Sequence, residues 1–115
     1  MRYFYTYQFY ICKNVYHPFY NITDCLNQVV VNLATKDKAY ETSWFLGNCT
    51  SNQTYENNQN YSKSCCLDRG KYNLRCIDSG ADGWNGGFIT IQGKQYCQHF
   101  DNDEFSTDID IMGRF

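Results

Sequence analysis

Residues 71–91, KYNLRCIDSGADGWNGGFITI, contain the pattern that decides the fold of this 115-residue chain. The stretch 71–78 alternates, so that Tyr72, Leu74 and Cys76 fall on one face, as the period of two in a β-strand requires. A glycine-rich segment, 80–87, follows and predicts a loop, because glycine permits tight backbone turns. Residues 88–91 are aromatic and β-branched, as strand residues commonly are. The stretch therefore predicts a strand, a loop and a second strand.

The same kind of pattern extends outward along the chain. We expect strands at 2–12, 27–35, 41–46, 71–78, 88–91, 94–100 and 105–112. Gln92-Gly93 predicts a hairpin turn, and the Asn- and Gln-rich stretch 48–64 predicts a surface loop, while 63–71 holds a helical turn at most. Apolar spacing of 3.6 residues never persists, so residues 1–115 predict one all-β domain, a small antiparallel β-sandwich or jelly-roll-like fold.

Composition excludes several classes of protein. Ten basic and twelve acidic residues give a net charge of −2, which argues against a nucleic-acid-binding protein. No apolar run approaches the ~18–20 residues of a membrane-spanning helix. The 11 Tyr, 8 Phe and 2 Trp argue against a disordered chain.

The seven cysteines predict disulfide bonds and an oxidising, extracellular or cell-surface location. They are Cys12, Cys25, Cys49, Cys65, Cys66, Cys76 and Cys97. None of them has the close spacing of a zinc site, and two adjacent cysteines suit two different disulfide partners. Because seven is odd, three disulfides leave one cysteine, which is either a buried thiol or a link to another subunit. The pairing itself stays open.

Asn-x-Ser/Thr sequons also favour a secreted protein, because they are acceptors for N-linked glycans. They lie at Asn21, Asn48, Asn52 and Asn60, three of them within one polar stretch. Residues 1–13 lack the pattern of a signal peptide, so a secreted chain would be already processed or a piece of a longer protein.

The glycine-rich loop also holds oxygen-bearing side chains. Asp78, Asp82 and Asn85 have a spacing that a calcium-binding loop could use. The loop is not an EF-hand, because Gly80 and Ile89 occupy positions that need oxygen ligands. The alternative is that the aspartates hydrogen-bond amides of the loop while Trp84 covers the core.

Residues 78–86, DSGADGWNG, resemble the D-S-x-G-D-G-W-N-G motif of secreted and cell-surface modules of protists and bacteria. Ala81 stands where that motif has glycine. The resemblance covers about 20 residues and implies an extracellular β-module, with no defined activity.

These observations predict a structural glycoprotein that self-associates into a filament or matrix. The strand expected at Tyr3–Ile11 carries large side chains on both faces, which suits addition to the sheet of a neighbouring subunit. The alternative is a carbohydrate- or calcium-binding module, with Trp44 and Trp84 stacking on sugar rings. We expect no enzyme, because His17 and His99 lie in no catalytic motif.

Overall fold

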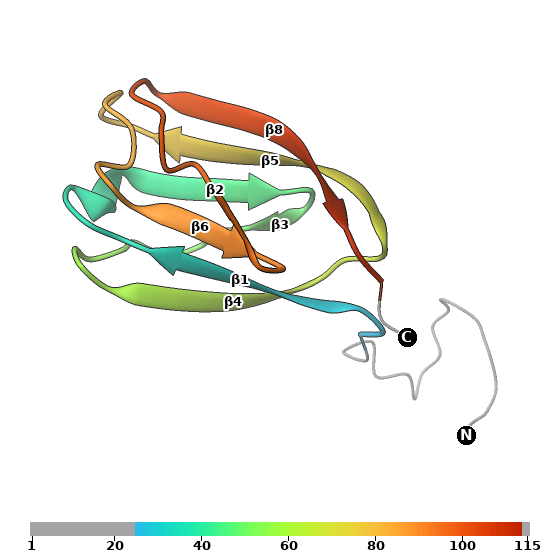
Figure 1. Cartoon of the computed structure of the whole chain (residues 1–115). Coiled ribbons are helices and arrows are strands. Elements are labelled where there is room, and N and C mark those ends of the chain that lie inside the picture. The colour runs from blue at the N-terminus through green and yellow to red at the C-terminus, as the bar shows by residue number, and fades with distance from the viewer. Residues whose placement is uncertain (1–24, 114–115) are drawn as a thin grey trace, which may run out of the picture.

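The computed structural model describes residues 25–113, which form two antiparallel sheets packed face to face (Figure 1). In chain order the elements are β1 (Gln28–Ala34), the short 3-10 helix η1 (Ala39–Glu41), β2 (Thr42–Leu46), β3 (Cys49–Thr50), β4 (Asn60–Cys66), β5 (Gly70–Asp78), β6 (Phe88–Ile91), β7 (Lys94–Tyr96) and β8 (Glu104–Ile111). Sheet A has the order β4-β1-β6-β7, and sheet B has the order β3-β2-β5-β8. The predicted β-sandwich is confirmed. No helix among the described residues is long and apolar enough to cross a membrane.

Three predictions concern residues that the structure does not describe. The strand expected at 2–12, the cysteine Cys12 and the sequon at Asn21 all precede residue 25. They remain predictions.

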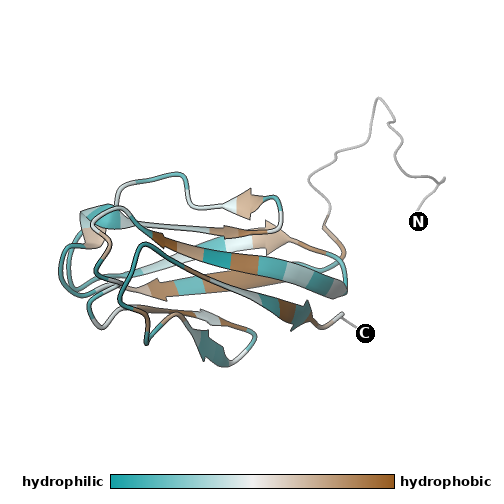
Figure 2. Cartoon of the chain, turned by 90° about the horizontal axis from the view of Figure 1, so that it is seen from above, coloured by the Kyte–Doolittle hydropathy of each residue, from teal (hydrophilic) through white to brown (hydrophobic). Residues whose placement is uncertain are grey.

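Alternating side chains of both sheets build the core. Bands of hydrophobic and hydrophilic residues alternate along the strands in Figure 2. The fully buried apolar side chains include Val29 and Val31 of β1, Trp44 and Leu46 of β2, Leu74 of β5, Ile89 and Ile91 of β6, and Ile111 of β8. Each such aliphatic side chain contributes about 1.5–3 kcal/mol when it leaves water, so these faces hold the two sheets together.

The strand β4 corrects two predictions. It occupies part of the stretch 48–64 that was expected to be a loop, and it runs through the start of 63–71, where a helical turn was expected. Its sequence, NYSKSCC, is polar, and only Cys65 is buried. It forms because it pairs along its whole length with β1, from Gln28↔Cys66 to Ala34↔Asn60. Pairing with an apolar neighbour therefore makes this strand, since its own apolar pattern is weak.

The hairpin between β6 and β7 follows the prediction at its turn. Gln92 and Gly93 both have positive φ, 48° and 84°, as a two-residue turn between right-twisted strands requires. The returning strand is shorter than the expected 94–100, because β7 ends at Tyr96. The next residue, Cys97, has a φ of 69° and a disulfide to Cys76, so the chain leaves the sheet there.

Three disulfides tie the strands together. Cys49 pairs with Cys65 and joins β3 to β4, across the two sheets. Cys76 of β5, in sheet B, pairs with Cys97, which directly follows β7 of sheet A. Cys25 pairs with Cys66 and fastens the start of β1 to the end of β4.

The adjacent cysteines have different partners, as expected. Cys65 is buried, at 2% exposure, and Cys66 points to the exposed face of the same strand. Neighbouring strand residues face opposite sides of a sheet, so one reaches across the sandwich and the other reaches along the sheet. All six cysteines of residues 25–113 are paired, which leaves none of them for Cys12.

Candidate functional sites

Asp78 organises the glycine-rich loop. It is the last residue of β5, and only 1% of its surface is exposed. Its Oδ2 accepts a hydrogen bond from the amide of Asp82 at 2.6 Å, and its Oδ1 accepts one from the amide of Gly80 at 3.2 Å. Asp78 thus acts as the alternative prediction describes, by bonding amides of the loop.

Trp84 covers the core beneath this loop. Its indole is 3% exposed, and Nε1 donates a hydrogen bond to the carbonyl oxygen of Ile77 at 3.0 Å. The ring of Phe100 packs edge-on against it, with the centroids 5.9 Å apart. The carboxylate of Asp78 and the indole of Trp84 therefore both hold this loop in place.

The structure brings a third carboxylate, that of Glu41, to the two aspartates that were predicted as calcium ligands. Oxygen atoms of Glu41, Asp78 and Asp82 lie within 4.8 Å of one another. Asn85 lies beside this group: its side-chain nitrogen donates to Asp82 Oδ1 at 3.4 Å and to the Gly83 carbonyl oxygen at 3.3 Å. Glu41 reaches the loop from the end of η1, and no local pattern marks it in the sequence, since it lies far from Asp78 along the chain.

A lysine already supplies positive charge to the acidic cluster. Lys38 Nζ lies 2.9 Å from Asp82 Oδ2, and both side chains are partly exposed. This hydrogen bond lowers the pKa of Asp82 and raises the pKa of Lys38. Both carboxylate oxygens of Asp78 accept hydrogen bonds from amides. Asp78 and Asp82 therefore already have partners without a bound ion.

Glu41 is the least satisfied member of the cluster. Its Oε1 is buried and has no hydrogen-bond partner among the described residues. The carboxylate packs over Gly80, where a Cβ would collide with it. Burial, followed by the neighbouring Asp78 carboxylate, raises the pKa of Glu41.

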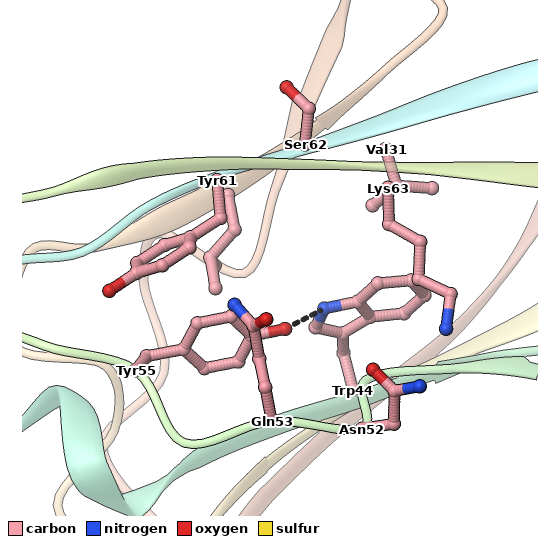
Figure 3. Close-up of a pocket in the computed structure, with 9 residues that line it drawn as sticks. Val31, Trp44, Asn52, Gln53, Tyr55, Tyr61, Ser62 and Lys63 are labelled. Atoms are coloured by element: carbon pink, nitrogen blue, oxygen red, sulfur yellow. Dashed lines mark hydrogen bonds between the residues drawn. The ribbon is translucent and has the colours of Figure 1, made fainter.

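A cavity of about 290 Å³ opens between the sheets beside β4 (Figure 3). Its lining consists of Val31, Leu33, Trp44, Asn52, Gln53, Tyr55, Tyr61, Ser62 and Lys63. Trp44 Nε1 donates a hydrogen bond to the hydroxyl of Tyr55 at 3.1 Å, the contact dashed in Figure 3. Burial raises the pKa of Tyr55, while the hydrogen bond from Trp44 works against that shift. Sequence reasoning missed this cavity, because it combines β1, β2, β4 and the loop before β4.

The predicted sugar-stacking tryptophans are both core residues. Trp44 is 1% exposed and Trp84 is 3% exposed. Their faces are covered by protein, so neither ring is presented to a flat ligand. The structure does not support the stacking role that the sequence suggested for them.

The three described sequons lie on one side of the sandwich. Asn48 precedes β3, Asn52 follows it, and Asn60 opens β4. All three side chains are exposed. The disulfide between Cys49 and Cys65 shows that β3 and β4 lie on the same side, so glycans at these positions would cover that side.

The chain matches no protein-family model, no curated protein and no solved structure. The resemblance of residues 78–86 to the D-S-x-G-D-G-W-N-G modules therefore stays a prediction.

Proposed function

We propose that this chain is a structural extracellular glycoprotein, a subunit or module of a surface filament or matrix, which assembles by strand addition. Three disulfides within residues 25–113 are compatible with an extracellular location. Exposed sequons support glycosylation, because an oligosaccharyl group needs an accessible asparagine.

The observation that carries the proposal is the open sandwich. The outermost long strands, β4 and β8, each pair with a single neighbour within the described residues. An unpaired edge offers a row of amides and carbonyls to another strand. Residues 3–11 have the alternating pattern of a strand, with large side chains and no charged residue. A strand that adds to such an edge has these features.

Deletion of residues 1–12 from the secreted chain tests the assembly. We expect the parent to sediment as oligomers and the deleted chain as a folded monomer. A deleted chain that assembles like its parent would exclude strand addition through this segment.

The same material tests the role of Cys12. Electrophoresis with and without reductant, after removal of glycans, shows whether Cys12 links subunits. We expect a dimer that collapses on reduction and that is absent from the variant Cys12→Ser. A parent that runs as a monomer without reductant would remove the covalent part of the proposal.

A second candidate is a carbohydrate-binding module, which the cavity beside β4 favours. Two tyrosines and the amides of Asn52 and Gln53 line it, and sugars bind to such mixtures of rings and polar groups. Titration of monosaccharides and disaccharides, followed by tryptophan fluorescence, tests this role. We expect Gln53→Ala to weaken binding and Gln95→Ala, an exposed residue of β7, to leave it unchanged. Flat titrations across the sugars would exclude this candidate.

A further inference from the structure

We infer that β8 is the edge that receives residues 3–11 of a second copy of this chain, in antiparallel pairing. The inference rests on the strand addition proposed above and identifies its acceptor.

Strand length leaves two possible acceptors. The four outermost strands are β4 and β7 in sheet A and β3 and β8 in sheet B. β3 has 2 residues and β7 has 3, which is too short to bind a long strand. β4 has 7 residues and β8 has 8.

The β4 edge is protected. All three described sequons flank β3 or open β4, so glycans would crowd this side. Lys63 of β4 turns into the gap between the sheets, where its Nζ donates to the carbonyl oxygen of Thr50 at 2.7 Å. A charge that points inward from an edge strand is a device that natural proteins use against strand addition.

The β8 edge lacks this protection. The three described sequons, at Asn48, Asn52 and Asn60, flank β3 and β4, and β8 itself contains none. Phe105, on its inward side, is still 37% exposed, which leaves apolar surface for a further strand to cover. Eight residues of β8 span about 27 Å, close to the length of an extended segment 3–11.

Charge also favours β8. Residues 1–23 contain Arg2 and Lys13 and no acidic residue. Around β8 lie Asp101, Asp103, Glu104, Asp108 and Asp110. Asp101, Asp103 and Asp108 take no part in the ion pairs of the described residues. In antiparallel pairing Lys13 falls beyond Glu104, near Asp101 and Asp103, so unlike charges meet.

Direction favours a second copy over the chain's own segment. Asn27 Nδ2 donates to the carbonyl oxygen of Met112 at 3.1 Å, so the chain enters β1 beside the end of β8. A segment that ran straight back from there along β8 would be parallel to it. Every strand pair of the described sheets is antiparallel. A strand from another copy can approach from the Glu104 end and keep that pattern.

Complementation between two full-length variants tests the inference, in a Cys12→Ser background that removes covalent dimers. Tyr7→Pro disables the donor, because proline cannot complete a strand ladder. Thr107→Lys disables the acceptor, because it places a charge on the half-buried inward side of β8. Ser64→Lys on the exposed side of β4 is the matched control. Sedimentation velocity measures the size of each species.

We expect each disabled variant alone to be monomeric, and an equal mixture to form a heterodimer that grows no further. Ser64→Lys should assemble like its parent. Hydrogen exchange gives a second readout that needs no β8 substitution: amides of Glu104–Ile111 should gain protection when the parent assembles, at least tenfold, and those of Asn60–Cys66 should not.

Other results would overturn the inference in distinguishable ways. Assembly that survives Thr107→Lys, or protection that appears on β4 instead, would reject β8 and leave strand addition standing. A monomeric parent whose stability falls with both Tyr7→Pro and Thr107→Lys would assign the segment to its own chain. A monomeric parent that Tyr7→Pro does not affect would reject the proposed function itself.

Discussion

Asp78 Oδ2 lies 2.6 Å from the backbone amide nitrogen of Asp82, so the last side chain of β5 holds the amide four residues farther along the loop. The same carboxylate also accepts the amide of Gly80. Asp78 is itself buried, so its carboxylate depends on these two amides for hydrogen bonds.

Asp78→Ala should therefore destabilise the protein. The change removes the acceptor of both amides, and a lost hydrogen bond costs about 0.5–1.5 kcal/mol, so the two together are worth about 1–3 kcal/mol. Urea unfolding should show a loss of that size. The matched control, Asp37→Asn, alters an exposed aspartate and should stay within about 0.5 kcal/mol of the parent. An Asp78→Ala midpoint equal to that of the control would mean that the loop does not depend on this carboxylate.

Two positions in the same loop should respond oppositely to glycine and alanine. Ala81 has a φ of 62°, a left-handed conformation that disfavours residues with a Cβ. Ala81→Gly should relieve that strain and stabilise the protein by up to about 1 kcal/mol, after the extra entropy of the unfolded glycine is deducted. This also gives a physical reason for the glycine that the resembling motif has at this position.

Gly83→Ala should instead destabilise the protein by more than about 1 kcal/mol. Gly83 has a φ of 78°, and a Cβ there would collide with the carbonyl of Phe100. Thermal melting of both variants checks the pair. Ala34→Gly, in β1, controls for the general cost of an added glycine, about 0.5–1 kcal/mol. If Ala81→Gly loses as much stability as Ala34→Gly, strain at Ala81 contributes nothing.

Glu41→Gln should stabilise the protein at neutral pH. Burial and the Asp78 carboxylate raise the pKa of Glu41 in the folded state, so its ionised form disfavours folding. That penalty is present above the raised pKa and fades as the pH falls toward the pKa of the unfolded chain, about 4.3. The gain from glutamine should therefore be largest at pH 7 and should vanish near pH 4. Denaturant midpoints across this range measure it.

Glu56→Gln, at an exposed position, controls for a general effect of removing one negative charge. A gain from Glu41→Gln that matches that of Glu56→Gln, or that does not change with pH, would contradict the explanation from the carboxylate cluster.

Calcium should leave the thermal midpoint unchanged. The carboxylate of Asp82 already forms an ion pair with Lys38, and that of Asp78 already accepts two amide hydrogen bonds. A cation would have to displace these interactions. Millimolar Ca²⁺ is the right range, because extracellular modules bind calcium with Kd of about 10⁻⁴–10⁻³ M. Lys38→Gln removes the competing ammonium and provides the comparison. A rise in the parent's midpoint with Ca²⁺ but not with Mg²⁺ would show that the cluster binds the ion after all.

Local sequence patterns predicted much of the fold. Strands β1, β2, β5, β6 and β8 follow alternation or β-branched runs, and the turn at Gln92-Gly93 follows from its residue types. The different partners of Cys65 and Cys66 were expected from their adjacency, and the structure explains them, because neighbouring residues of β4 face opposite ways.

The sequence by itself therefore determined an all-β, disulfide-bonded chain with a glycine-rich loop after β5, since periodicity and turn chemistry act over a few residues. Only the tertiary structure decided that the polar stretch Asn60–Cys66 is a strand, because β1 supplies its partner. It also decided which cysteines pair and that Glu41 joins Asp78 and Asp82. These relationships join residues far apart in the chain, and packing of the two sheets creates the proximity that no local pattern encodes.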